Sequence, residues 1–156
     1  MIVSAGLAFV HFAAVFGIVC TLFFEWLTMS PAPSFSEATR IQLCDRGYGT
    51  CAAAVLIVGF VRATHFEKGW AFYTASPFFY GKLALFVLLG VISIYPTIRF
   101  IKWRTQMRRG TGPVLSTREY KLIMVSLNAE LLLLLGVALC ASLMARGIGV
   151  WGFGWK

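Results

Sequence analysis

Four long apolar stretches decide what this chain can fold into. They lie at residues 3–27, 48–66, 77–101 and 120–145, and each matches the length of about 20 residues that a helix needs to cross a bilayer. Of the 156 residues, 59% are hydrophobic and 13% are charged, so a soluble domain of this length could not bury the apolar surface. Continuous apolar runs also argue against a β-barrel, whose strands alternate. The sequence therefore predicts an all-α membrane protein, an antiparallel four-helix transmembrane bundle that forms a single domain over residues 1–156.

The connections between these spans carry helix signals of their own. Two prolines end the first helix, and Ser34 with Glu37 has the spacing of a capping box. We therefore expect a short interfacial helix between spans one and two. In the last connection, Ser116 or Thr117 is expected to cap the fourth span.

Positive charge gathers at the third connection. Half of the 14 lysines and arginines flank or fill it: Arg99, Lys102, Arg104, Arg108, Arg109, Arg118 and Lys121. The positive-inside rule places loops 28–47 and 102–119 in the cytoplasm and both termini on the outer, periplasmic side. Basic residues this close to a membrane predict binding of the 99–121 segment to anionic lipid headgroups, and no nucleic-acid partner.

Several common kinds of site have no sequence signal here. The four cysteines form no Cys-x-x-Cys pair, so neither a disulfide framework nor a zinc site is expected. The chain also shows no catalytic triad, phosphate-binding loop or zinc-hydrolase motif. The remaining candidates are polar residues inside the spans.

Ionisable residues in the spans repeat at helical spacing, which gives each span a polar face. His11 and Glu25 share a face of the first span, and Tyr48, Gly59 and Arg62 share a face of the second. Such residues normally point into the bundle and have partners, because a bare charge in hydrocarbon is costly. These faces are therefore expected to meet other helices.

Depth suggests which of these residues can meet. At 1.5 Å per residue, His11 lies roughly 13 Å below the outer surface and Glu130 roughly 15 Å above the inner one. A contact between His11 and Glu130 is therefore geometrically allowed. Glu25 lies at the cytoplasmic boundary, where an ion pair of Glu25 with Arg99, or of Asp45 with Arg118, is expected.

One hypothesis assigns these residues to a haem site. Histidine is the usual axial ligand of haem iron in helical membrane bundles, which makes His11 the candidate iron ligand. Arg62 and Lys82 could pair with the haem propionates, and Trp70 and Tyr80 could cover the edge of the macrocycle. The alternative interpretation is structural: His11 forms a buried hydrogen bond, and the two cations extend to headgroups.

The same hypothesis gives further residues a role. His65 is a candidate second ligand, although it lies well above His11 in the outer connection. Glu130 could orient the imidazole or carry protons. Lys82 and Glu130 are the candidate catalytic residues.

Three segments resemble a bacterial family of four-span inner-membrane proteins of unknown function. They are LCDRGYGTCAAAVLIVGFVRATHFEKGWAFY, SPFFYGKLALFVLLGVISIYPTIRFIKW and NAELLLLLGVALCASLMARG, and together they cover nearly the whole chain. The resemblance implies a bacterial inner-membrane location.

A weaker resemblance extends to the four-helix membrane protoporphyrinogen oxidase, which binds haem b, and to the copper-resistance D-type membrane domain. His11 in FVHFAAVFG matches their first-span histidine, and Lys82 in YGKLALF matches a lysine that opens a later span. The resemblance implies haem b as a cofactor and an oxidoreductase activity. After its first histidine the oxidase has a Leu/Tyr-rich stretch that ends in arginine and a second histidine, whereas this chain has FFEWLTM, and no histidine follows Lys82 in the third span.

Three functional hypotheses follow. The first is a haem-b or porphyrin-binding redox protein that exchanges electrons with a membrane partner. The second is a transport module for a metal or small molecule, with His11 and Glu130 along its path. The third is a structural or accessory subunit without a cofactor, acting as a homo-oligomer or within a larger membrane complex.

Overall fold

The long apolar stretches form four long helices. The computed structural model describes residues 2–66 and 70–149. Its elements are α1 (Ile2–Thr28), α2 (Phe35–Val61), the π-helical turn η1 (Arg62–Phe66), α3 (Trp70–Thr74), α4 (Pro77–Met107) and α5 (Thr117–Ala145). The four long helices, with η1 extending α2, are long and apolar enough to cross a membrane. The predicted all-α four-helix bundle is confirmed.

The helix caps lie where the sequence places them, but one expected helix is not separate. Ser34 accepts a hydrogen bond from the Glu37 backbone N–H, and the Glu37 carboxylate accepts one from the Ser34 N–H at 2.8 Å. Ser116 caps α5 by accepting from the Glu119 N–H at 3.2 Å. The capping box at Ser34 starts α2 itself, so the prediction of a separate short interfacial helix is wrong. Its residues are the first turns of one helix that runs on into the second span.

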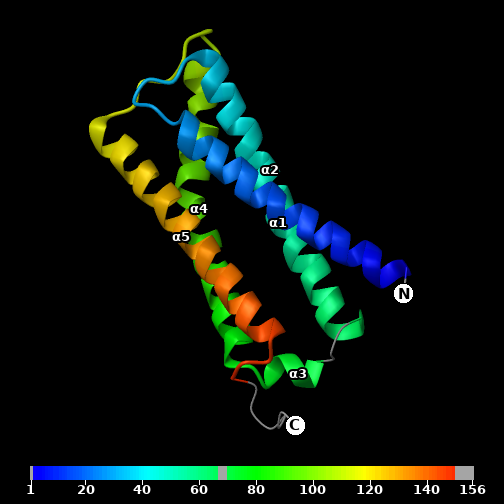
Figure 1. The fold of residues 1–156 in the computed structure, drawn as a ribbon. Coiled ribbons are helices and arrows are strands. Elements are labelled where there is room, and N and C mark those ends of the chain that lie inside the picture. The colour runs from blue at the N-terminus through cyan, green and yellow to red at the C-terminus, as the bar shows by residue number, and fades with distance from the viewer. Residues whose placement is uncertain (1, 67–69, 150–156) are drawn as a thin grey trace.

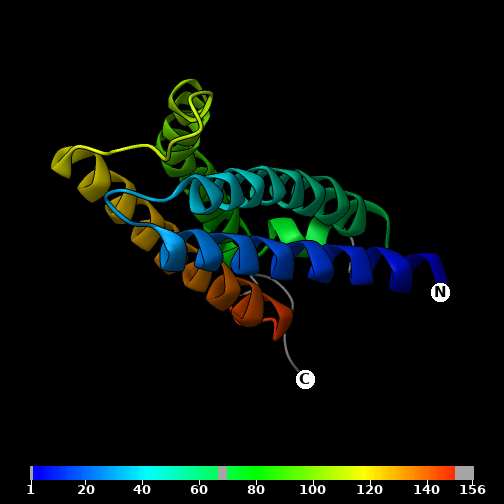
Figure 2. The same ribbon diagram turned by 90° about the horizontal axis from the view of Figure 1, so that it is seen from above.

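The helices pack as two antiparallel hairpins, α1 with α2 and α4 with α5 (Figure 1). The hairpins lie closest to each other where the two loops 29–34 and 108–116 connect the helices, and we call this the basic end. Towards the opposite end, which we call the N-terminal end, α1 extends away from α5 (Figures 1 and 2). There α3 lies between the end of α2 and the start of α4.

The two loops hold the basic end together. The Leu115 N–H donates to the Pro31 carbonyl at 3.0 Å, and Pro33 and Pro113 are both fully buried. The Gly112 backbone packs so closely that a Cβ there would lie 2.0 Å from the Pro33 carbonyl oxygen. The absence of a side chain at Gly112 therefore allows one loop to rest directly on the other.

The main core lies between the hairpins, towards the basic end. Its most buried side chains come from all four long helices: Ile18, Leu22, Ile41, Leu89, Phe100, Ile123 and Leu127. Large apolar side chains elsewhere are exposed, such as Phe9 at 73%, Leu132 at 69% and Val125 at 65%. A membrane helix presents apolar side chains to lipid in this way, whereas buried polar groups mark its interior contacts.

Candidate functional site

Two carboxyl groups are buried in the core between the hairpins. Glu25 of α1 is 3% exposed, and Glu130 of α5 is 1% exposed. Helical spacing puts them there, because Glu25 follows Ile18 and Leu22 on the buried face of α1, and Glu130 follows Leu127 on that of α5. The apolar stripes that pack the hairpins together therefore carry both acids into the interface.

Tyr48 of α2 completes a group that we call the acidic cluster, consisting of Glu25, Tyr48 and Glu130. Tyr48 is 6% exposed, and its hydroxyl lies towards the Glu130 carboxyl and towards Ser93 of α4. Within the described residues, the Tyr48 hydroxyl and the Oε1 atoms of Glu25 and Glu130 are buried without meeting hydrogen-bond geometry. The cluster therefore buries three polar side chains together, with the Tyr48 hydroxyl facing the Glu130 carboxyl.

The charges that act on the acidic cluster are negative. Glu130 acts on Glu25, and Asp45 of α2 acts on both glutamates. Among residues 2–66 and 70–149, neither buried glutamate has a lysine or arginine within salt-bridge distance. Two carboxylates in such surroundings repel, and burying either one as an anion is expensive.

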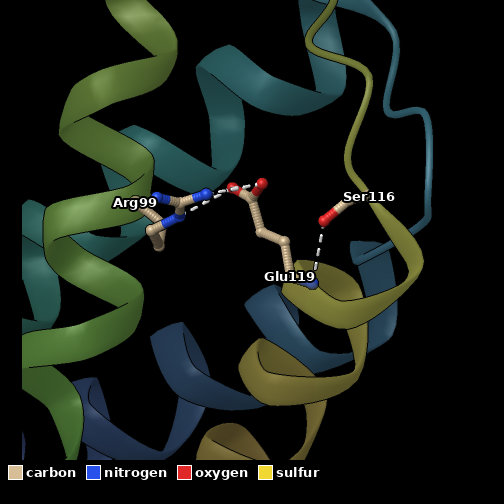
Figure 3. A network of polar contacts seen from close by, with 3 residues as sticks. All are labelled: Arg99, Ser116 and Glu119. Atoms are coloured by element: carbon tan, nitrogen blue, oxygen red, sulfur yellow. Dashed lines mark hydrogen bonds and ion pairs between the residues drawn. The ribbon is translucent and has the colours of Figure 1, made fainter.

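Arg99 of α4 is bound to a carboxylate outside the acidic cluster. Arg99 donates to Glu119 of α5 through Nε at 2.8 Å, and its second nitrogen lies 2.6 Å from the other carboxylate oxygen (Figure 3). This fork binds α4 to α5, beside the Ser116 cap that fixes the start of α5. The predicted ion pair between Glu25 and Arg99 is therefore wrong, because Arg99 faces the partner helix of its own hairpin.

Hydrogen bonds between helices surround the acidic cluster. Trp26 next to Glu25 donates through Nε1 to the Asn128 side-chain oxygen at 3.1 Å, which links α1 to α5. The Thr97 hydroxyl donates to the Asp45 carboxylate at 2.5 Å, which links α4 to α2. These contacts fix the rotation of all four helices about the cluster.

The candidate haem residues His11 and Arg62 lie together at the N-terminal end. A Cβ at Gly59 of α2 would lie 3.1 Å from the His11 Cε1 atom, so the imidazole packs over the bare backbone of that glycine. The Arg62 guanidinium lies 5.6 Å from the ring centre of Phe12, the residue after His11. The predicted stripe of Gly59 and Arg62 therefore faces α1, as expected.

The other candidate residues are arranged around α3. The Lys82 ammonium lies 5.6 Å from the ring centre of Phe79. Trp70 makes edge-to-face contacts with Phe60 of α2 and with Phe79 of α4. Trp70 therefore connects the end of the first hairpin to the start of the second.

Two of the candidate haem residues, Tyr80 and His65, are exposed at the protein surface. Tyr80 is 54% exposed. His65 is exposed, and its Nδ1 atom is hydrogen bonded to the Thr64 hydroxyl at 2.6 Å. His65 follows Gly59, which His11 contacts, by six residues, a rise of about 9 Å along α2 and η1. This separation agrees with the expectation that His65 lies well above His11.

The structure separates His11 from Glu130. His11 lies against Gly59 of α2, and Glu130 lies near Tyr48 of α2. Tyr48 precedes Gly59 by eleven residues. Eleven residues correspond to about 16 Å along a helix axis, so no direct contact forms. The meeting of Glu130 with Tyr48 and Glu25 was missed in the sequence, although the spacing of Ile18, Leu22 and Glu25 already indicates a buried face.

The acidic cluster does not resemble a metal centre. Within residues 2–66 and 70–149, no three side chains of histidine, cysteine, aspartate or glutamate are arranged to hold a metal ion. The acidic cluster has two carboxyl groups and a phenol, and no basic side chain of the described residues pairs with them. Such a group is suited to sharing a proton, which neutralises negative charge and, unlike a metal ion, needs no set of ligands around it.

Comparison with known proteins gives a family. The model of a family described as "Predicted membrane protein (DUF2214)" matches residues 3–149. No curated protein and no solved structure matches the chain. The match agrees with the expected family of membrane proteins of unknown function. The comparisons give no support to the expected similarity to protoporphyrinogen oxidase or to the copper-resistance domain.

Proposed function

The chain belongs to the family described as "Predicted membrane protein (DUF2214)", and we propose that it is a proton-transporting membrane module whose binding site is the acidic cluster. The burial of Glu25 and Glu130 together, with no cation in salt-bridge distance among the described residues, carries this proposal. Intramembrane carboxyl groups in bundle interiors are typical of proton relays. A proton held between the two acids removes the cost of burying both as anions.

The place of the cluster in the fold explains how a bound proton could change the structure. Glu25 belongs to one hairpin and Glu130 to the other, so loss of the proton creates repulsion across the contact between them. The hairpins meet at the basic end and separate towards the N-terminal end (Figure 1). Protonation would therefore close the contact between the hairpins, and deprotonation would loosen it. The acidic cluster would thus alternate between a closed and an exposed state.

The proposed proton path continues on the N-terminal side. His11 lies about 16 Å beyond the cluster, on the same side of α2 as Tyr48 and Gly59. Histidine exchanges protons near neutral pH. In this proposal, His11 carries protons between the acidic cluster and the N-terminal end.

Proton flux into vesicles tests the proposed function. The purified protein would be reconstituted with a pH-sensitive dye inside, and a potassium gradient with valinomycin would drive protons inward. We expect the wild type to acidify vesicles faster than empty ones do. Glu130→Gln should lower the rate to that of empty vesicles, because the amide cannot take up and release a proton.

Glu37→Gln is the matched control, since glutamine still completes a capping box and Glu37 lies outside the cluster. It should retain the wild-type rate. Wild-type flux equal to that of empty vesicles, or equal flux in Glu130→Gln and wild type, would contradict proton transport.

A second candidate function rests on the position of His11 and Arg62 at the N-terminal end, where both lie at the contact between α1 and α2. In this second proposal a haem b would be held through one imidazole: His11 would hold the iron, and Arg62 and Lys82 would pair with the propionates. Trp70 and Tyr80 would cover the edge of the ring. Haem would supply one-electron chemistry with a membrane redox partner, and Glu130 is too far from His11 to orient its ring directly.

An absorbance spectrum tests the haem proposal. After expression with ample haem, a haem-binding protein should show a Soret band and sharp bands on dithionite reduction. His11→Ala should lose these bands, whereas His65→Ala should keep them. A folded wild type that stays colourless after incubation with an excess of haem and removal of the unbound haem would contradict this proposal. That result would leave proton transport unaffected.

The location and partners follow from charge and from the apolar surface. The basic end would face the cytoplasm and both termini the periplasm of a bacterial inner membrane, by the positive-inside rule. The 99–121 segment would contact anionic lipid headgroups. Exposed apolar side chains on the four long helices would face lipid or a second copy of the chain.

A further inference from the structure

A pocket of about 310 Å³ lies between α2 and α4, towards the basic end. Its polar lining comes from both helices: Gln42, Asp45, Arg46, Thr97 and Arg104. Arg46 and Arg104 are exposed, so the pocket opens at the surface at the depth where α4 approaches its basic end. Charged groups at that depth keep a cavity hydrated.

Asp45 is the acidic residue of this pocket, and it also belongs to the surroundings of the acidic cluster. It precedes Tyr48 by three residues, so both side chains lie on one face of α2, about 4.5 Å apart along the axis. Its carboxylate accepts from the Thr97 hydroxyl at 2.5 Å and acts on the charges of Glu25 and Glu130. Asp45 therefore lines the pocket and is also close enough to the buried acids to act on their charges.

Apolar side chains close the opposite side of the cluster. Ile18 of α1 and Leu89 of α4 are each 1% exposed and lie on the N-terminal side of Glu25 and Ser93. A proton that arrives from the basic end meets a polar pocket, whereas one that arrives from the N-terminal end meets packed side chains first. The two sides of the cluster thus differ in access.

We propose that protons reach the acidic cluster from the basic end through the α2–α4 pocket, with Asp45 as the residue that passes them on. This inference rests on the proposed proton transport. An O–H bond of a hydronium ion in the pocket breaks as an O–H bond forms on the Asp45 carboxylate, and a neutral water molecule is left. The O–H bond on Asp45 then breaks as an O–H bond forms on Glu25 or Glu130, and Asp45 returns to its carboxylate form. No electron or other group moves.

The groups that face Asp45 set its charge environment. Arg46 is its neighbour on α2, Arg104 lines the same pocket from α4, and the buried acids approach from α1 and α5. The arginines keep a positive rim, and the acids present negative charge inside. A proton therefore moves from the positive rim towards the negative cluster, which is the direction that electrostatics favours.

The rate of proton uptake after a pH jump tests Asp45. For the reconstituted protein with its basic end outward, Asp45→Asn should slow uptake by about a hundredfold, as removal of a proton-transferring side chain does. Asp45→Glu should restore most of the rate. Added formate should also restore it in Asp45→Asn, because a small weak acid can occupy the pocket and carry protons. A purely structural role for Asp45 would give no formate rescue.

The outcomes separate this inference from the proposed function. Wild-type uptake in Asp45→Asn, with uptake lost in Glu130→Gln, would overturn the Asp45 route and keep the acidic cluster as the site. Slow uptake in Asp45→Asn without rescue by formate would also overturn the route. Unchanged uptake in Glu130→Gln would overturn proton transport and the route together. If Asp45→Asn fails to fold, Asp45→Ala, which removes the carboxyl group and leaves space for formate in the pocket, provides the same comparison.

Discussion

Replacing Gly112 by alanine is expected to destabilise the protein by about 3 kcal/mol or more, at the upper end of the cost of overpacking. The new Cβ would lie 2.0 Å from the Pro33 carbonyl oxygen and within 3.1 Å of two further backbone atoms at Ser34 and Phe35. Because these are backbone atoms, no side chain can rotate away, and the two loops must move apart. The melting temperature in detergent should fall sharply.

Gly90→Ala is the matched control for this substitution. Gly90 is exposed on α4, and no atom outside its own stretch of helix lies within 4 Å of the position that a Cβ would take. Its change in stability should stay within about 1 kcal/mol, since alanine favours a helix over glycine. A Gly112→Ala protein as stable as Gly90→Ala would show that the loops are not in direct contact.

Gly112 matters for function because the loops join the hairpins at the basic end. The same end carries the core that buries Glu25 and Glu130. If the loops are forced apart, water can enter the contact between the hairpins. The loss of stability in Gly112→Ala should therefore be accompanied by faster exchange of the cluster's protons with solvent.

The second large effect is expected from replacing both Glu25 and Glu130 by glutamine. Glutamine has nearly the shape of a protonated glutamate, so the fold should persist, and repulsion between two buried anions can no longer arise. The double variant should therefore be at least as stable as wild type at alkaline pH. It should also lose the spectroscopic signal of a buried, protonated carboxyl group.

The elements that the sequence predicts well depend on local chemistry. Apolar length alone places the four spans, and the caps at Ser34 and Ser116 follow from short motifs whose partners lie three residues away. The continuity of α2 was missed because Gln42, Asp45 and Arg46 interrupt the apolar pattern. Ala38 and Ile41 are nevertheless fully buried and continue the face that carries Tyr48, so the helix does not end there.

The acidic cluster could be predicted only in part. The spacing on α1 places Glu25 on a buried face, and the spacing on α5 does the same for Glu130. Which residues meet across the interface depends on how the hairpins are rotated, and sequence spacing carries no information on that. For this reason Arg99 seemed available to Glu25, whereas it binds Glu119 in its own hairpin.

For the candidate haem residues too, the sequence predicts which residues share a helix face but not which residues of different helices meet. Arg62 and Gly59 share a face of α2 that packs on α1, as their spacing predicts. Depth alone allowed His11 to reach Glu130, but helix depth was estimated for each span separately. The observed contacts of His11 with Gly59 and of Glu130 with Tyr48 place the two residues at different levels of the bundle.

The protonation of the acidic cluster is the central claim, and infrared spectroscopy measures it most directly. A protonated carboxyl group gives a carbonyl band that is separate from carboxylate absorption and shifts in heavy water. We predict this band in the wild type and in Glu37→Gln at neutral pH, reduced in Glu25→Gln or Glu130→Gln, and absent from the double variant. A wild type with carboxylate absorption alone, or a band that persists in the double variant, would contradict the claim that Glu25 and Glu130 hold the proton.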